Sequence, residues 1–162
     1  MLLHIVRHAF AGQHGDPHYP DDRLRPLTKK GRKRFGRMTK KLVRRGFSAT
    51  LIATSPLVRC RQTAQLIADR LGPRAELREL DCLAPGGQLE SLVAWSNEQG
   101  VEELVWVGHS PDVDRFAAVL LGARDGSLLF AKGAVAAIHF DDEIADGQGE
   151  LRWFATPKIL GS

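Results

Sequence analysis

The chain has 162 residues, a length that a single domain accommodates most simply. Its composition, 43% hydrophobic and 26% charged, is that of an ordinary soluble protein. The net charge of +4 is uneven, since residues 1–45 hold 13 Lys and Arg against 3 Asp and Glu. The apolar N-terminal run is too short for a membrane span, which needs ~20 apolar residues. Arg7 interrupts that run and no small-residue cleavage site follows, which argues against a signal peptide.

The two cysteines, Cys60 and Cys82, are too few for a disulfide scaffold and lack zinc-ligand spacing. We therefore expect free thiols and a cytoplasmic location. The basic N-terminal part is compatible with nucleic-acid binding. A solvated helix face beside an anion site explains it better, because few aromatic residues are interleaved with the basic ones.

Strands and helices alternate along the predicted chain. The first half reads as a strand over residues 2–6, a polar loop over 12–26, a helix from Thr28 to Gly46 and a strand over 49–54. The second half reads as a helix from Ser55 to Gly72, a strand over 75–78, a helix over 89–99, a strand over 103–107, a helix from Ser110 and strands over 133–140 and 150–155. This order predicts a three-layer α/β/α sandwich with a mostly parallel central sheet, ending in a β-hairpin. The polar loop contains His14, Asp16 and His18, whose spacing matches no metal site, so we expect a surface loop and no metal.

Three predicted strands end in residues that suit a phosphoryl group. Arg7-His8 follows the first strand, Arg59 lies one turn beyond the second, and His109 follows the fourth predicted strand. The carboxyl ends of parallel strands share one edge of a sheet, where ligands bind. Guanidinium groups and helix N-termini bind phosphate oxygens, while one histidine attacks phosphorus and the other stabilises charge. Such a site needs neither a metal nor a cofactor, because the arginines neutralise the charge.

These residues lie within motifs that resemble a known family. Arg7-His8, the segment Ser-Pro-Leu-Val-Arg-Cys-Arg-Gln-Thr-Ala over residues 55–64, and Gly-His-Ser over residues 108–110 resemble the histidine phosphatase superfamily. That superfamily also includes the cofactor-dependent phosphoglycerate mutases. The resemblance spans residues 2–121. Arg-Pro-Leu-Thr over residues 25–28, Gly31 and the small size are similar to the SixA-type phosphohistidine phosphatases.

The resemblance implies a single histidine phosphatase domain over residues 1–162, with roles for individual side chains. His8 is the expected nucleophile, and the phosphoryl group is expected to be surrounded by Arg7, Arg59 and His109. The family usually has glycine after the nucleophile, where this chain has Ala9. Alanine is also small, so we expect only a slight change in backbone freedom.

Further contacts are expected from Arg25 and Ser110, which would bind substrate. Many relatives use an acidic residue after the third strand as proton donor, and Glu79 matches that position, with Asp81 or water as alternatives. An imidazole leaving group requires a weaker acid than a sugar alkoxide does, because imidazole is protonated near neutral pH. The connection from Gly72 to Gln88 is short and leaves little room for a cap over the site.

The predicted function is hydrolysis of a protein phosphohistidine, on a phosphotransfer domain or phosphocarrier, through phosphorylated His8. One alternative is a phosphatase of the same superfamily that acts on a small phosphomonoester. An alternative of another class is a basic module that binds nucleic acid, but such a module has no need of both His8 and His109.

Overall fold

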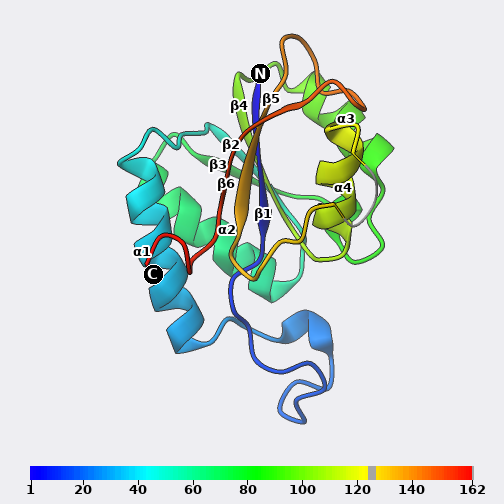
Figure 1. The fold of residues 1–162 in the computed structure, drawn as a ribbon. Helices are drawn as coiled ribbons and strands as arrows, with labels where there is room; N and C mark the ends of the chain where they lie inside the picture. The colour runs from blue at the N-terminus through cyan, green and yellow to red at the C-terminus, as the bar shows by residue number, and fades with distance from the viewer. Residues whose placement is uncertain (124–126, 162) are drawn as a thin grey trace.

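Among residues 1–123 and 127–161, which the computed structural model describes, six strands form one mixed sheet (Figure 1). The strands are β1 (Leu2–Arg7), β2 (Leu51–Thr54), β3 (Glu76–Glu79), β4 (Glu103–Gly108), β5 (Val135–His139) and β6 (Glu150–Ala155). Their spatial order is β3-β2-β4-β1-β5-β6. The pairs β3–β2, β2–β4 and β4–β1 are parallel, whereas β5 and β6 run antiparallel to their neighbours. The mostly parallel sheet that the sequence predicts is confirmed.

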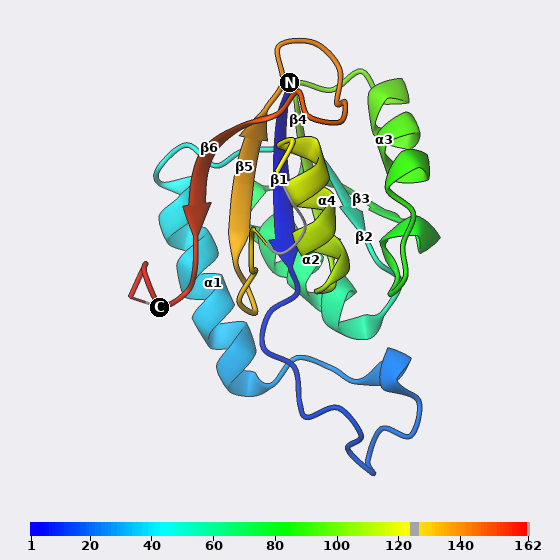
Figure 2. The same ribbon diagram turned by 45° about the vertical axis from the view of Figure 1, so that its right-hand side comes forward.

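Helices cover both faces of this sheet (Figure 2). The α-helices are α1 (Lys29–Val43), α2 (Val58–Leu71), α3 (Leu89–Glu98) and α4 (Asp112–Leu120), and two short 3-10 helices are η1 (Asp22–Leu24) and η2 (Asp81–Leu83). Helices α1 and α2 pack on one face, and α3 and α4 pack on the other. The predicted three-layer α/β/α sandwich is therefore confirmed. Within the described part of the chain, no helix has the length and apolar character needed to cross a membrane.

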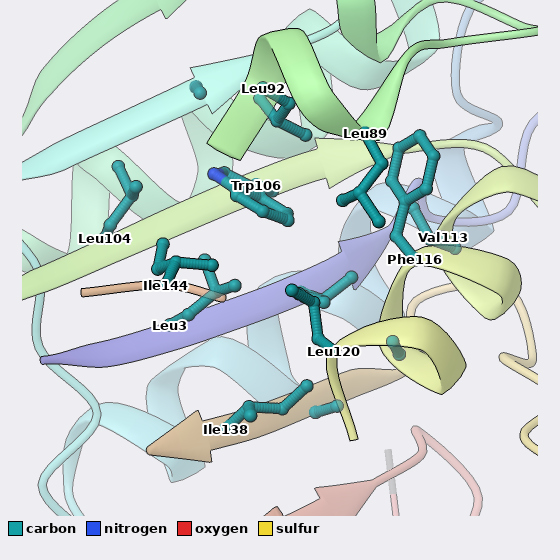
Figure 3. Close-up of a cluster of buried hydrophobic side chains, with 14 of the residues drawn as sticks. Leu3, Leu89, Leu92, Leu104, Trp106, Val113, Phe116, Leu120, Ile138 and Ile144 are labelled. Carbon is teal, nitrogen blue, oxygen red and sulfur yellow. The ribbon is translucent and has the colours of Figure 1, made fainter. Parts of the chain in front are cut away.

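The alternation of side chains along each strand divides the core in two. On β1, Leu3 and Ile5 join the cluster under α3 and α4, whereas Val6 joins the cluster under α1 and α2. Figure 3 shows the first cluster, with Trp106 of β4 at its centre. Trp106 is fully buried and its indole N–H donates to the Ser96 hydroxyl over 3.0 Å. Both faces of the central strands are thus mostly apolar. The polar residues follow the strands and lie at the edge of the sheet.

The helix starts differ from the sequence prediction at two places. Thr28 caps α1 as predicted, and its hydroxyl accepts from the Gly31 N–H over 2.9 Å. Helix α2 begins at Val58 rather than directly after Ser55, and α4 begins at Asp112 rather than at Pro111. Neither Ser55 nor Ser110 caps its helix. The Ser55 hydroxyl accepts from the Leu57 N–H, ahead of the helix, and contacts His109, whereas the Ser110 hydroxyl donates to Asp114.

The last two strands pair as predicted but with a longer connection. Strands β5 and β6 are antiparallel neighbours, with an irregularity in the register between Ala137 and Ile138. Residues 140–149 join them, so the connection is a loop rather than a tight turn. The antiparallel pair extends the sheet beyond β1 and leaves the parallel strand ends of β1, β4 and β2 at its centre.

Candidate active site

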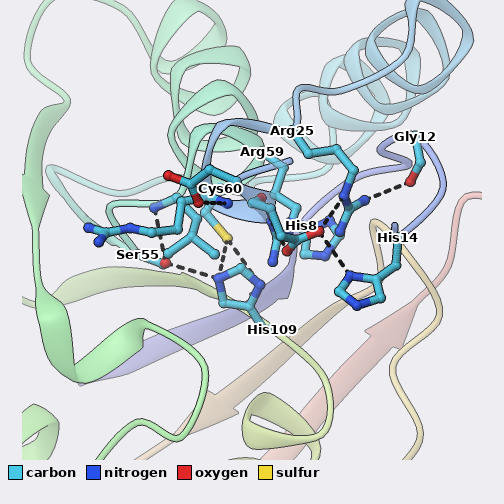
Figure 4. Close-up of polar contacts among 12 residues, drawn as sticks. His8, Gly12, His14, Arg25, Ser55, Arg59, Cys60 and His109 are labelled. Atoms are coloured by element: carbon cyan, nitrogen blue, oxygen red, sulfur yellow. Dashed lines mark hydrogen bonds and ion pairs between the residues drawn. The ribbon is translucent and has the colours of Figure 1, made fainter. Parts of the chain in front are cut away.

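The three strand ends singled out by the sequence lie next to one another. Strand β4 lies between β1 and β2, and Arg7 pairs with Gly108 in the register. Four side chains, which we call the His–Arg cluster, therefore meet at one edge of the sheet: Arg7, His8, Arg59 and His109. Figure 4 shows His8, Arg59 and His109 at this edge. The loop over residues 12–26 lies at the same edge (Figure 1). An isolated antiparallel bridge between Ala11 and Leu27 closes the base of that loop.

His8 follows β1 and is only 6% exposed. Its Nδ1 lies 2.7 Å from the Ala9 carbonyl oxygen. A carbonyl only accepts hydrogen bonds, so Nδ1 must carry the proton, and the neutral ring keeps its lone pair on Nε2. Burial, together with the nearby His109, Arg59 and Arg7, lowers the pKa of His8 to about 3, although the hydrogen bond to the Ala9 carbonyl acts in the opposite direction. His8 is thus a neutral imidazole at physiological pH with an available Nε2.

Arg59 and Arg25 are both buried and share one carboxylate, that of Asp22 in η1. Arg25 Nε donates to Asp22 Oδ1 over 2.7 Å, and Arg59 Nη1 lies 3.0 Å from Asp22 Oδ2. Arg59 Nη1 also donates to the Asp22 carbonyl over 2.8 Å. The hydrogen bond from Arg25 holds the pKa of Asp22 well below its usual range. Asp22 therefore positions two cations at the cluster, a role that the sequence analysis did not assign.

Arg7 is fixed from the opposite side, by the segment after α4. Its Nη1 donates to the Phe130 carbonyl over 2.6 Å. The Phe130 N–H in turn donates to Asp114 Oδ1 over 3.0 Å. Ser110, predicted to bind substrate, donates its hydroxyl proton to Asp114 Oδ2. The structure thus places Ser110 in a network that supports Arg7.

Two guanidinium N–H groups remain without an acceptor within the described part of the chain. They are Nε of Arg7 and Nε of Arg59, both buried. A buried donor without a partner costs about 1–3 kcal/mol, so native proteins rarely leave one unpaired. An anion with several oxygens at the cluster would satisfy both. The arrangement is therefore suited to a phosphoryl group.

His109 directly follows β4 and is 4% exposed. Its Nε2 lies 2.9 Å from the Ser55 hydroxyl and 3.3 Å from the Cys60 sulfur. Burial lowers its pKa to about 3, with a further contribution from Arg59. The Cys60 thiol is fully buried, and burial raises its pKa to about 12, so it faces His109 as a neutral group. The His8 and His109 rings are 5.3 Å apart, centroid to centroid.

The Gln-Thr pair of the predicted motif holds the cluster together. Gln62 accepts from the Leu27 N–H over 2.8 Å, and Thr63 accepts from the Ala9 N–H over 3.0 Å. Thr63 donates its own proton to the Arg59 carbonyl. Helix α2 is thereby bound to the segments on either side of the loop over residues 12–26. These two attachments explain why the motif over residues 55–64 has Gln and Thr at adjacent positions.

Glu79, the predicted proton donor, lies at the end of the edge strand β3. It pairs with Arg61 at 3.1 Å, and both side chains are about half exposed. Among the described residues, no hydrogen bond or ion pair joins Glu79 to the His–Arg cluster. The structure thus brings together five of the predicted site residues, Arg7, His8, Arg25, Arg59 and His109. Glu79 lies outside this group.

The histidines of the loop over residues 12–26 form separate pairs. His14 lies 3.0 Å from Asp22, and His18 lies 2.9 Å from Asp16. Among residues 1–123 and 127–161, no group of three or more His, Cys, Asp or Glu side chains is placed to hold a metal ion.

The buried histidines predict a loss of stability on mild acidification. The pKa values of His4, His8 and His109 are lowered from 6.5 to about 4, 3 and 3, in each case mainly by burial. Below pH 6.5 these histidines become protonated in the unfolded chain but stay neutral in the folded chain. The free energy of unfolding therefore falls as the pH falls. We expect a loss of about 1–2 kcal/mol per histidine between pH 7.5 and pH 5, measured by urea unfolding. Asp22 does not contribute in this window, since an unfolded aspartate titrates near pH 3.9.

A control for this prediction is His4→Phe, because His4 is buried in the core against Phe47 and lies outside the His–Arg cluster. This variant should show a smaller loss of stability between the two pH values. An unfolding free energy that is equal at pH 7.5 and pH 5 in the unaltered protein would contradict the neutral burial of these rings.

The chain shows clear similarity to known proteins. Residues 3–117 match the sequence profile of the histidine phosphatase superfamily (branch 1). The chain is 36% identical over 138 residues to an uncharacterized protein from Picosynechococcus sp.. This alignment covers 83% of this chain and 81% of that protein. The fold matches the protein histidine phosphatase SixA complexed with tungstate over 99% of both chains, with a TM-score of 0.86 and 26% identity. The alpha-ribazole phosphatase from Shigella flexneri shares the fold over 97% of both chains, with a TM-score of 0.71 and 18% identity. The chain that carries this His–Arg cluster belongs to the histidine phosphatase superfamily and is a phosphatase, a hydrolase.

Proposed function

We propose that this phosphatase hydrolyses protein phosphohistidine through a covalent phosphoryl intermediate on His8. The observation that carries the mechanism is the pairing of the His8 Nδ1–H with the Ala9 carbonyl, which leaves Nε2 free to attack. Arg7 and Arg59 each have one buried N–H group without a partner among the described residues, and these two groups supply donors for phosphoryl oxygens. We also propose that residues 1–162 form one domain and that the protein acts in the cytoplasm, a location that two free cysteines support.

In the first step, His8 Nε2 attacks phosphorus and forms a P–N bond. The P–N bond of the substrate breaks, and the leaving imidazole keeps the electron pair and takes up a proton from solvent water. The Ala9 carbonyl accepts from Nδ1–H and so stabilises the positive charge that develops on the His8 ring. Arg7, Arg59 and His109 stabilise the charge on the phosphoryl oxygens, with Arg25 held nearby by Asp22.

In the second step, a water molecule attacks phosphorus and gives up a proton to solvent, and the P–N bond breaks with its electron pair returning to Nε2. The products are inorganic phosphate and neutral His8. The arginines carry the positive charge that metal ions supply in other phosphoryl-transfer enzymes. We therefore expect turnover to persist in EDTA.

The chemistry of the leaving group supports phosphohistidine as the substrate. Glu79, the expected acid, is paired with Arg61 and is outside the cluster. An alkoxide needs a proton as it leaves, whereas imidazole is protonated near neutral pH and leaves with weaker help. The end-to-end match to a protein histidine phosphatase supports the same substrate class. Between α2 and α3 lie only β3 and η2, so no inserted segment covers the site on that side.

The test compares kcat/KM for a phosphorylated histidine-containing phosphotransfer domain with kcat/KM for a panel of small phosphomonoesters, both in EDTA. We expect at least about 100-fold preference for the phosphoprotein, which corresponds to about 2.7 kcal/mol of transition-state discrimination. Efficient turnover of phosphomonoesters with none of the phosphoprotein would contradict the proposed substrate. It would instead favour a small-molecule phosphatase, as the fold shared with alpha-ribazole phosphatase allows.

A further inference from the structure

A pocket of about 480 Å³ opens beside the His–Arg cluster and has no part in the chemistry described above. Its apolar lining includes Phe10, Phe35 and Pro157. Three cationic side chains also line it: Arg34 of α1, Lys132 of the segment before β5, and Lys158 after β6. We call this cavity the side pocket. It combines an apolar floor with a positively charged rim.

The side pocket shares backbone with the His–Arg cluster. Ala9 and Phe10 line it and directly follow His8 in the chain. The Gly133 N–H, also in the lining, lies 3.2 Å from the Arg7 carbonyl and 3.1 Å from the His8 carbonyl. Partial burial lowers the pKa of Lys132, and the nearby charges of Arg7 and Arg25 lower it further. The side pocket therefore adjoins the place where the phosphohistidine of a bound protein would meet His8.

Glycine keeps the side pocket open at its floor. Gly133 has a φ of +79°, in the left-handed region that favours glycine. A Cβ at this position would lie 3.1 Å from a ring carbon of Phe35 and 3.1 Å from Pro157 Cγ. The apolar surface between Phe35 and Pro157 is thus left uncovered by the chain itself.

Exposed apolar side chains lie on segments that contact the cluster. Phe10 is 51% exposed, and Lys132 Nζ lies 4.5 Å from its ring centroid. Leu24, in the same short helix as Asp22, is 59% exposed, and Leu129, next to Phe130, is 78% exposed. Single exposed apolar residues are common on proteins. Here Leu24 and Leu129 adjoin the groups that hold the arginines, and Phe10 lies two residues after His8, an arrangement that suits a surface that contacts another protein.

We propose that the side pocket docks an acidic segment of the phosphohistidine-bearing protein, with one apolar side chain on the floor and carboxylates at the rim. This inference rests on the proposed function and names the partner chemistry that the site would select. Charge complementarity is the argument, because the rim is cationic on three separate segments. Attraction of this kind steers encounter and orients the partner, and it weakens as salt is added.

The test replaces Lys158 with Glu, because Lys158 is exposed at the rim and has no part in the chemistry. Arg70→Glu is the matched control, since Arg70 is exposed on α2, is absent from the side-pocket lining and gives the same change in net charge. Activity is measured on the phosphorylated phosphotransfer domain and on free phosphohistidine, at low and high salt. We expect Lys158→Glu to lower kcat/KM on the phosphoprotein by about 10-fold, mainly through KM, and to leave free phosphohistidine unchanged. The deficit should shrink at high salt, and Arg70→Glu should change both activities by less than about 3-fold.

Two results would overturn docking alone, leaving the proposed function in place. One is an equal loss on both substrates, which would make the side pocket part of the site for the leaving group. The other is no loss on the phosphoprotein in a variant that turns over normally. A protein that turns over neither phosphohistidine substrate would overturn the proposed function, and the docking proposal with it.

Discussion

His8→Ala is expected to abolish turnover, with a loss of roughly 10⁴-fold or more, because it removes the proposed nucleophile. The fold should be retained. His8 lies at the end of β1, and its hydrogen bond to the adjacent Ala9 carbonyl holds no other segment in place. Removing a buried imidazole also removes a group whose protonated form the fold disfavours. The measurement is single-turnover dephosphorylation, with thermal unfolding to verify the fold.

The matched control is His18→Ala, because His18 is exposed in the loop over residues 12–26 and pairs only with the nearby Asp16 among the described residues. It should retain full activity. Phosphatase activity of the His8→Ala variant within 10-fold of the unaltered protein would disprove the assignment of the nucleophile.

Arg59→Ala has the second largest expected effect. The buried guanidinium is held by Asp22, and its Nε–H has no partner in the part of the chain that the structure describes, so its loss should remove the charge-assisted contacts proposed for the phosphoryl group. We expect binding of vanadate or inorganic phosphate to weaken, and kcat/KM to fall, by about 2–4 kcal/mol, or roughly 30- to 1000-fold. Calorimetry on vanadate and steady-state kinetics give the two values.

Arg61→Ala is the control for Arg59, two residues along the same helix. Arg61 is half exposed and pairs with Glu79, so its removal should change vanadate affinity by less than about 3-fold. Arg59→Lys keeps the charge and much of the packing, and it should recover only part of the loss because lysine lacks the planar fork. Vanadate affinity that is equal in Arg59→Ala and the unaltered protein would remove Arg59 from the site.

The sequence predicted the sheet and the meeting of its strand ends because both follow from local patterns. The mostly apolar run at residues 2–6 identified a buried strand, and polar residues came at once after it. Parallel strands put their carboxyl ends at one edge, so Arg7, His8 and His109 could be grouped without coordinates. Arg59 joined them because it lies in the first turn of the helix after β2.

The contacts between segments distant in the sequence could not be predicted from sequence patterns. Ser55 before Pro56 has the pattern of a helix cap, but its hydroxyl contacts His109 of the neighbouring strand end. Asp22 lies in a loop that has no periodic pattern of apolar residues, and its ion-pair partner Arg59 is 37 residues further along the chain. Only its spacing of three residues from Arg25 was a local signal. The support of Arg7 by Asp114 through Phe130 depends on how the segment before β5 packs against α4.

The most direct test of the central claim is to trap the phosphorylated enzyme. Labelled phosphohistidine protein is mixed with excess enzyme in EDTA, and the reaction is stopped in alkali, where P–N bonds survive. We expect one labelled peptide, with the phosphoryl group on Nε2 of His8, that forms before inorganic phosphate appears. Release of phosphate without label on His8, at a rate equal to turnover, would contradict a covalent mechanism through this residue.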